Sequence, residues 1–250
     1  MQQLHEGEHV TDLLAPYRVE RRPPDGDRCW VMANMVGGLD GSAAVGGRVG
    51  ALSHGADAEL FRLMRAVADV VLVGAETVRR EGYGPVRLPE ERCRERVERG
   101  RAATPPLAIV SRSLRLDWDA EVFTRASADS PTMIVTCAAA ARADLDRARA
   151  AATVVVAGDE RVDLADALSQ LRAFGHEVVL CEGGPTLLGE LAAAGLLDEL
   201  CLTLSPMMGG DPLPVAITPP GGGLTEFELR HTAVDSGTLF LRYETCRHDR

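Results

Sequence analysis

Residues 178–190 read VVLCEGGPTLLGE, and no other stretch says as much about how the chain folds. Its first four residues are apolar and predict a buried parallel strand, which Glu182 follows directly. Gly183 and Gly184 let the backbone approach a ligand closely, and Pro185 fits the first position of a helix because no N–H donor is needed there. Exposed amides and the dipole at a helix start attract anions, most simply phosphate. The stretch therefore predicts a strand, a turn and a helix that bind a phosphate-bearing ligand beside Glu182.

A second turn of the same kind follows residues 69–73 (DVVLV), which predict another buried strand. It reads Gly74-Ala75-Glu76-Thr77, in which Gly74 and Ala75 are small and Thr77 carries a hydroxyl. Ligands bind at the carboxyl ends of strands in open α/β sheets, so two such turns fit the two halves of a dinucleotide. Either turn alone could use glycine for steric reasons only. The two together, with a carboxylate beside one of them, favour a ligand site, although the usual G-x-G-x-x-G fingerprint does not occur.

Hydrophobic periodicity extends this alternation of strand and helix along the chain. The predicted strands are 29–36, 69–73, 107–111, 132–136, 153–157, 177–181 and 198–205. The predicted helices are 57–67, which Ser53 caps, a short one after Gly74, 163–174 and 185–194. Strands that alternate with helices predict an α/β fold with a mostly parallel sheet covered on both faces.

The remaining segments predict a hairpin, a loop and one domain. Strands 225–232 and 238–245, joined across Asp235-Ser236-Gly237, predict a C-terminal antiparallel hairpin. Residues 82–106 are rich in arginine, glutamate, proline and glycine and predict an exposed loop with at most a helical turn. We expect a loose N-terminal arm over 1–28 and a single domain over 29–250.

The charge of the chain limits its partners. The net charge of −10 and the sequence pI of about 5.1 argue against a general nucleic-acid or anionic membrane surface. All 27 basic residues are arginine. Pyridoxal-phosphate chemistry and a Walker-type loop both require lysine and are therefore excluded. Anionic groups of a substrate would have to meet arginine, which suits phosphate.

Cysteine and histidine predict neither disulfides nor a metal site. The six cysteines form no C-x-x-C pair, and several lie in apolar runs, which is typical of reduced core thiols in a cytoplasmic protein. Residues 5–9 match the H-E-x-x-H zinc pattern, but the match contains a glycine and lies at the extreme N-terminus, so we interpret it as chance. We expect neither a signal peptide, because the N-terminus is polar and acidic, nor a membrane span, because no apolar run is long enough.

Three charged residues are further candidates for a site. Arg65 ends an apolar helix face and Arg87 follows a Gly-Pro turn. Asp40 lies in a glycine-rich turn after the first strand, where aspartate is common for conformational reasons alone. A solvated surface is the default environment of such arginines, unless they converge on a cleft at the strand ends.

Four blocks of sequence, in this order, carry a resemblance to a known family. They are LDG at 39–41, LMRA at 63–66 followed by ADVVLVGA at 68–75, EGGPTL at 182–187, and LDEL at 197–200 before Ser205-Pro206. On these blocks, residues 29–245 resemble the reductase half of bacterial bifunctional riboflavin-biosynthesis deaminase/reductases and the related stand-alone pyrimidine reductases.

The resemblance implies a three-layer, dihydrofolate-reductase-like fold and a reduction that uses NADPH. That family reduces the ribosylamino side chain of a phosphorylated pyrimidine, of the 5-amino-6-ribosylaminouracil phosphate type, in riboflavin biosynthesis. The residues that it implies for NADPH are Ser53 and Asp57 at the adenosine half, and Gly74, Ala75, Thr77, Gly183, Gly184, Pro185, Thr186 and Leu187 around the pyrophosphate.

The same resemblance implies that Arg65, Arg87 and Glu182 contact the substrate. The nicotinamide supplies hydride to the sugar carbon, so the protein must orient the reactants and provide a proton. We expect Glu182 or Asp40 to be the proton donor. The resemblance also implies a cytoplasmic homodimer, for which strand 238–245 is a candidate edge.

Three positions depart from the family pattern. Gly38 stands where the family has serine, Ser42 where it often has a basic residue, and Glu76 where it has a small residue near the expected pyrophosphate. No deaminase half with its H-x-E and P-C-x-x-C signature accompanies these blocks. Two alternatives therefore stay open: a reductase of another heterocycle, such as a pterin or dihydrofolate, and a non-catalytic NADP-binding paralogue.

Overall fold

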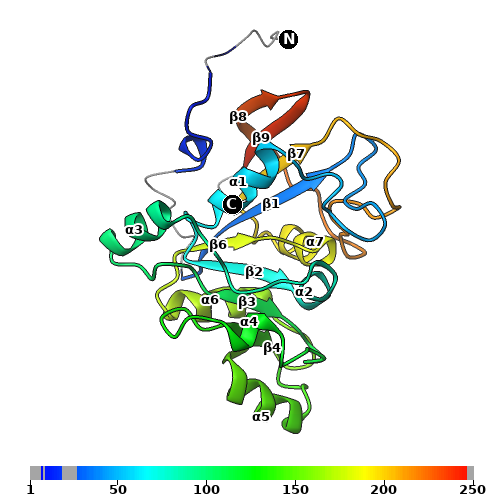
Figure 1. Cartoon of the computed structure of the whole chain (residues 1–250). Coiled ribbons are helices and arrows are strands. Elements are labelled where there is room, and N and C mark those ends of the chain that lie inside the picture. Colours follow the sequence, from blue (N-terminus) through cyan, green and yellow to red (C-terminus); the bar gives the residue numbers. More distant parts are fainter. Residues whose placement is uncertain (1–6, 8, 19–26, 247–250) are drawn as a thin grey trace.

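A computed structural model describes residues 7, 9–18 and 27–246. The described residues form one nine-stranded sheet in the order β5-β4-β3-β2-β6-β1-β7-β9-β8 (Figure 1). The strands are β1 (Trp30–Gly37), β2 (Val70–Gly74), β3 (Leu107–Val110), β4 (Met133–Thr136), β5 (Thr153–Val156), β6 (Val178–Cys181), β7 (Glu199–Leu204), β8 (Phe227–Asp235) and β9 (Thr238–Thr245). The first seven pair in parallel, and β9 pairs antiparallel with both β7 and β8.

Helices cover both faces of this sheet. They are α1 (Ala56–Met64), α2 (Ala75–Glu81), α3 (Glu90–Glu98), α4 (Glu121–Thr124), α5 (Arg142–Ala151), α6 (Leu164–Ala173) and α7 (Pro185–Ala193), with a short 3₁₀ turn, η1 (Ala15–Tyr17). The predicted three-layer α/β fold with a mostly parallel sheet and a C-terminal antiparallel hairpin is confirmed. Every predicted strand is present within two or three residues of its expected ends.

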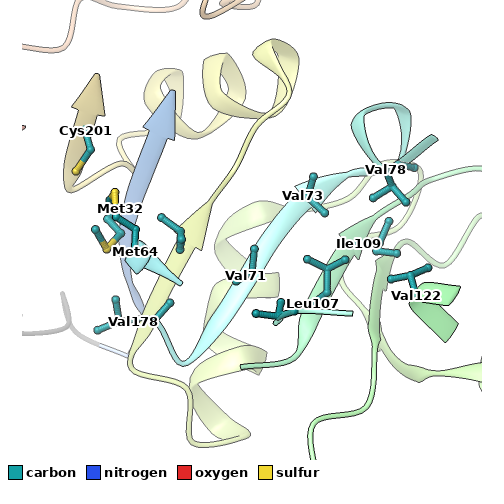
Figure 2. Packing of buried hydrophobic residues seen from close by; sticks show 14 of the residues in the cluster. Met32, Met64, Val71, Val73, Val78, Leu107, Ile109, Val122, Val178 and Cys201 are labelled. Carbon is teal, nitrogen blue, oxygen red and sulfur yellow. The ribbon is translucent and has the colours of Figure 1, made fainter. Parts of the chain in front are cut away.

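Alternating side chains of the strands form two cores, as the pleat of a sheet requires. On one face, Met32 of β1 packs with Met64 of α1 and Cys201 of β7, and Val73 of β2 packs with Val78 of α2 (Figure 2). On the other face, residues such as Val31 and Leu72 pack against α6 and α7. Helices α2 and α7, which follow β2 and β6, therefore pack on opposite faces of the sheet. Both helices begin at the edge of the sheet where these two strands end.

Helix α1 is shorter than predicted and has a different cap. It begins at Ala56 after Gly55, whose φ of 55° favours glycine, and no side chain caps it, so Ser53 is not its cap. It ends at Met64 because the next amides, of Ala66 and Val67, bond to carbonyls three residues back. The prediction of a helix over 57–67 was therefore wrong at both ends by one to three residues.

The segment 82–106 contains a full helix, α3, where a loop with at most one helical turn was predicted. Its Arg96 is only 4% exposed, because the guanidinium donates to the carbonyls of Ala66, Ala68 and Ala102. This buried arginine ties α3 to the connection between α1 and β2. Arg96 of this charged segment thus makes a structural contact, whereas composition alone predicted that the segment would be exposed to solvent.

The C-terminal hairpin and the N-terminal residues also differ in detail from prediction. Strand β9 lies between β7 and β8, so the exposed edge is β8 and not the predicted 238–245. The hairpin turn is Ser236-Gly237, and both residues have positive φ, as two-residue hairpin turns prefer. Leu14 and Tyr17, from the expected loose arm, are nearly fully buried in the first core.

Candidate functional site

A cleft of about 1130 Å³ lies at the carboxyl ends of β1, β2, β3 and β6. Its walls come from these strand ends, from α1, α2 and the start of α7, and from two loops that contribute residues between 43 and 50 and at Leu213 and Ile217. This is the position at which open α/β sheets bind ligands. Of the predicted site residues, all but Asp40 and Gly183 line this cleft.

The two glycine turns meet directly at the base of the cleft. The Gly74 N–H donates to the carbonyl of Gly183 at 2.8 Å. A β-carbon at Gly184 would lie 2.7 Å from Oγ1 of Thr77, so this close approach requires glycine. Gly183 has a φ of 82° and lies against the Met35 sulfur rather than in the cleft. The two strand-end turns that the sequence predicts to share a ligand site are therefore in contact with each other.

The start of α7 has the features of an anion site. Gly184 is its N-cap and makes no side-chain capping bond, Pro185 follows, and the first turn contains no acidic residue. The first amides of a helix have no partner within it, and the helix dipole adds partial positive charge at this end. Thr186 and Leu187 in this turn line the cleft. These residues fit a phosphate or pyrophosphate group.

Glu182 lies at the end of β6 and is held on both carboxylate oxygens. Arg65 donates from Nε to Oε1 at 2.6 Å and from Nη2 to Oε2 at 2.7 Å. The Tyr83 hydroxyl donates to Oε2 at 2.8 Å. The Glu182 side chain is fully enclosed, whereas 15% of the Arg65 side chain is exposed. We call these three residues the Arg65–Glu182–Tyr83 network.

Aromatic rings flank the cation of this network. The Arg65 guanidinium carbon lies 4.7 Å from the centre of the Phe61 ring and 5.6 Å from that of Tyr83. Burial lowers the pKa of Arg65, but the Glu182 carboxylate more than offsets this effect, and the pKa is raised overall. Burial, and then the charge of Glu182, raise the pKa of the Tyr83 hydroxyl well above its ordinary value. Arg65 is therefore charged and Tyr83 neutral at neutral pH.

Tyr83 was not among the site residues predicted from the sequence. It lies just after α2, and 99 residues separate it from Glu182. The only local signal is an aromatic residue in the Gly82–Pro85 turn, and no spacing rule connects such a turn to the end of β6.

Asp40 lies away from the cleft. Its carboxylate accepts from the hydroxyl of Ser42 at 2.6 Å, and from the amides of Ser42, Gly209 and Gly210 at 3.2, 2.7 and 3.3 Å. The Ser42 hydroxyl, and then these amides, hold the pKa of Asp40 far below its ordinary value. The observed contacts of Asp40 join the turn after β1 to the loop after β7.

Two other charged residues discussed from the sequence, Arg87 and Glu76, lie at the rim of the cleft. Three quarters of the Arg87 side chain is exposed, and its nearest ion-pair partner is Glu121 at 3.9 Å. Glu76 pairs with Arg79 at 3.0 Å and with Arg80 at 2.9 Å. Because these arginines hold the Glu76 carboxylate, its charge does not stand unopposed beside the glycine turns.

Two carboxylates fasten the glycine-rich loop that closes one side of the cleft. Asp211 accepts from the amides of Gly46 at 3.0 Å and Gly47 at 2.6 Å. Glu81 of α2 accepts from the amide of Val49 at 3.2 Å. Neither carboxylate could be recognised from the sequence, because both bind backbone amides of residues far away in the chain.

Other classes of site have no support among the residues described. Within 9–18 and 27–246 no group of three or more histidine, cysteine, aspartate or glutamate side chains is placed to hold a metal ion. None of the helices in these ranges has the length and apolar character needed to cross a bilayer. Most of the H-E-x-x-H match at 5–9 lies outside the described residues.

Known proteins are similar to this chain in sequence. The 2,5-diamino-6-ribosylamino-4(3H)-pyrimidinone 5′-phosphate reductase of Methanothermobacter thermautotrophicus is 30% identical over 183 residues, covering 73% of this chain and 80% of that protein. The protein of the same name from Archaeoglobus fulgidus is 26% identical over 184 residues, covering 73% and 83%.

Solved structures agree with these sequence relatives. A pyrimidine reductase-like protein from Corynebacterium diphtheriae superposes with a TM-score of 0.79 at 28% identity, covering 88% of this chain and 93% of that one. RibD from Acinetobacter baumannii shares the fold, with a TM-score of 0.69 at 20% identity, covering 89% of this chain and 59% of that one. The profile of the RibD C-terminal domain family matches residues 29–240. The chain therefore belongs to the RibD C-terminal domain family.

Proposed function

We propose that this protein is an NADPH-dependent reductase that acts on the ribosylamino side chain of a phosphorylated pyrimidine. The observation that carries the proposal is the cleft itself, in which two glycine turns and the open start of α7 adjoin a buried arginine–carboxylate pair. The names of the sequence relatives, which are reductases of a ribosylaminopyrimidinone phosphate, support the same chemistry.

The pyrophosphate of the cofactor would lie between the two turns. The amides of Thr186 and Leu187 would bind it on one side, and Gly74, Ala75 and Thr77 would face it on the other. Gly184 supports this role because even a β-carbon there would collide with Thr77. Pro185 fixes the start of α7 without adding a side-chain donor.

NADPH rather than NADH is favoured by arginines at one end of the cleft. Arg79 and Arg80 of α2 and Arg112, just after β3, line this end together with Ser111 and Ser113. Guanidinium and hydroxyl groups suit a 2′-phosphate. The adenosine half would then lie toward β3, and the nicotinamide toward β1, where Asn34 and Met35 line the cleft.

The Arg65–Glu182–Tyr83 network would bind and orient the substrate. When bound, the cofactor supplies a hydride for the sugar carbon. Arg65 presents a charged guanidinium whose direction both oxygens of Glu182 fix, so its geometry is set before any substrate arrives. Arg87, at the rim, is free to turn toward the substrate phosphate.

The substrate could carry an oxo or an amino group at pyrimidine carbon 2. The resemblance of the blocks implied the deaminated uracil form, whereas the named relatives act on the 2,5-diamino compound. The test is a fluorescence titration with NADPH and NADH, followed by NADPH consumption with each of the two pyrimidine phosphates. Turnover of either supports the proposal and identifies the form used.

The same assay separates the alternatives. Absence of NADPH binding would contradict every reductase function for this chain. Binding without turnover of either pyrimidine, but with turnover of dihydrofolate or a pterin, would assign another heterocycle. Binding with no turnover of any of them would assign a non-catalytic paralogue.

We further propose that the protein is a cytoplasmic homodimer. None of the six cysteines, all of which lie in the described residues, is joined in a disulfide, which suits a reducing compartment. The edge strand β8 presents unpaired backbone groups and the exposed side chains of Leu229 and Val234. Such an edge tends to pair with another chain, and a second copy offers a matching strand.

A further inference from the structure

A second cavity, of about 370 Å³, lies at the edge of the sheet opposite the cleft. Asp69, Pro106, Met133 and Thr153 line it, and these residues stand at or just before the starts of β2, β3, β4 and β5. The cleft lies where the parallel strands end, so the length of the strands separates the two sites. They share no lining residue among those described. We call the second site the amino-edge cavity.

Arg96 brings a buried guanidinium to the amino-edge cavity. The residue lines the cavity and is only 4% exposed. Its Nε and Nη1 donate to three backbone carbonyls, which use three of the five N–H donors of an arginine. The two donors on Nη2 bond to none of the described residues. They are not enclosed either, because the fully buried polar side-chain atoms that lack a partner in the described chain are the hydroxyls of Thr136 and Ser205.

The charges around Arg96 do not balance. Carbonyl oxygens carry no formal charge, and Arg96 forms no ion pair with a described residue. Asp69 lines the same cavity, but Arg101 pairs with its Oδ1 at 3.2 Å, and the amides of Glu177 and Val178 donate to its Oδ2 at 2.9 Å. Two guanidinium groups therefore share one carboxylate. A buried charge without a counter-charge is costly, so an anion in the cavity would be stabilised.

Arg96 keeps its charge at neutral pH in this environment. Burial, and then the charge of Arg101, lower the pKa of Arg96 to about 10, while Asp69 raises it. The excess positive charge at the amino-edge cavity is therefore present throughout the physiological range of pH.

Three other residues add donors to the cavity. Arg101 uses Nε for Asp69 and Nη1 for the carbonyl of Val67, so its Nη2 bonds to no described residue. His176 lines the cavity, and neither of its ring nitrogens bonds to a described residue. Burial lowers the pKa of His176, so its neutral imidazole offers one N–H donor. The hydroxyl of Ser130, from the loop before β4, belongs to the same lining.

The rest of the lining is apolar, with one opposing carboxylate. Phe174 is 56% exposed and lies beside the cations together with Pro106 and Met133. Asp129 also lines the cavity, but it is exposed, so solvent and salt screen its charge. A cavity of 370 Å³ with an apolar wall is the size of a small-molecule site rather than of a bare ion.

We propose that the amino-edge cavity binds the phosphate group of a small phosphate ester, such as a sugar phosphate. Guanidinium groups match phosphate in charge and geometry, and its three terminal oxygens suit donors that come from different segments of the chain. The organic part of the ester would lie against the apolar wall. Binding would supply the counter-charge that Arg96 lacks. This site is separate from the cleft and does not depend on the proposed function.

Proton NMR of His176 tests the proposal on the wild-type protein. The chain contains six histidines, and the His176→Gln variant identifies the resonance by its loss. Ribose 5-phosphate should shift this resonance in a saturable manner, inorganic phosphate should do so with weaker affinity, and ribose should leave it unchanged. Because His176 lies at the edge of the sheet opposite the cleft, its resonance does not report binding in the cleft.

Two variants should change the affinity in opposite directions. Arg101→Gln removes a guanidinium and leaves Asp69 without its cation, so ribose 5-phosphate should bind about tenfold more weakly. Asp129→Asn removes the opposing carboxylate, so binding should become about twofold tighter. Arg99→Gln is the matched control and should bind like wild type, because Arg99 is an exposed arginine at the end of α3 that does not line the cavity.

The outcomes separate the site from the kind of ligand. Absence of a saturable shift, or equal affinity in wild type and Arg101→Gln, overturns the site. If Arg101→Gln does not fold, unchanged affinity in Asp129→Asn overturns it as well. Equal affinity for ribose 5-phosphate and inorganic phosphate overturns the ester and supports a site for free phosphate. Turnover is not measured, so each result can be interpreted whether or not the protein reduces a pyrimidine.

Discussion

The pairing of Glu182 with Arg65 fixes two charges inside the protein and makes each depend on the other. Two short, charge-assisted bonds join them, and the Glu182 side chain is fully enclosed. A buried ion pair contributes little net stability, but removal of one partner leaves an uncompensated charge. The pair of Glu182 and Arg65 therefore couples the stability of the protein to the function of this cleft.

Glu182→Gln should weaken folding and turnover together. The substitution keeps the shape but removes the charge opposite Arg65, so we expect the free energy of unfolding to fall by about 2 kcal/mol. Most of the turnover should be lost because Arg65 is no longer held, while NADPH affinity stays within threefold of wild type. Urea denaturation, pyrimidine-dependent NADPH consumption and NADPH titration measure the three effects.

Glu177→Gln is the matched control. Glu177 directly precedes the first residue of β6, at the end of the strand opposite to Glu182, and its side chain is exposed. This variant should change neither stability nor turnover measurably. Near-normal turnover in Glu182→Gln would remove Glu182 from the mechanism.

Tyr83 should make stability sensitive to alkaline pH. Its pKa is higher in the folded protein than in the unfolded chain, so the folded state holds the proton more tightly. The contribution is complete below about pH 10 and is lost as the pH rises further, because the unfolded chain ionises first, with a slope of at most about 1.4 kcal/mol per pH unit.

The unfolding free energy of wild type should therefore fall more steeply between pH 9.5 and 11 than that of Tyr83→Phe, since the variant lacks this hydroxyl. Urea denaturation across this range checks it. Equal slopes would show that Tyr83 does not retain its proton in the folded state.

The sequence could predict which residues share the cleft, but not how their side chains meet. Glu182 and Arg65 were both predicted there, yet their bidentate contact spans 117 residues and has no local signal. Asp40 was a reasonable candidate, but its turn folds against the loop after β7. The conformation of this turn also accounts for glycine at position 38. A β-carbon there would lie 2.9 Å from Oδ1 of Asp40, so serine does not fit this turn.

At the scale of elements, α7 and the segment before β8 form one support for the cofactor cradle. The Ile217 amide donates to the carbonyl of Pro185 at 2.9 Å. A β-carbon on Gly189 would collide with the carbonyl oxygen of Ile217, so glycine lets the segment lie directly on the helix. The start of α7 is thus held by the sheet on one side and by the segment around Ile217 on the other.

Gly189→Ala should destabilise the protein, although glycine to alanine inside a helix usually stabilises by about 1 kcal/mol. Here the added carbon must displace backbone, which costs about 1–3 kcal/mol. Thermal unfolding gives the sign of the change, and NADPH titration should show weaker binding because Ile217 lines the cleft. A higher melting temperature would contradict the contact between Gly189 and Ile217.

Strands and helices whose apolar residues recur at regular spacing could be predicted from the sequence, whereas helices composed mainly of polar residues could not. The strands and α6 follow their hydrophobic patterns. Helices α3 and α5 consist mainly of arginine, glutamate, aspartate and alanine, which favour helix by propensity but offer little apolar periodicity. Arg96 anchors α3 through carbonyls of a distant connection, a contact that no pattern within 82–106 encodes.

At the scale of the whole molecule, the two sheet edges differ. β5 ends one side of the sheet and β8 the other. Along β8, Val234 is 66% exposed and Leu229 is 47% exposed. An uncovered strand with apolar side chains is suited to association with a second copy.

Val234→Lys should therefore convert a dimer into a monomer. Light scattering on wild type should give about twice the chain mass of 26.7 kDa, and on the variant a value near that mass. The control is Val97→Lys, which adds the same charge at an exposed valine of α3, and it should stay dimeric. Wild-type protein that is monomeric at micromolar concentration would refute the dimer.

The order of the strands also has a consequence for how the chain is made. β6 lies between β1 and β2, although residues 75–177 separate it from β2. During synthesis β1 and β2 leave the ribosome without their shared neighbour, and long-range parallel pairing is slow. The two halves of the cleft are joined only when residues 178–181 emerge. A chain that stops before residue 178 exposes two apolar strands and will aggregate rather than fold.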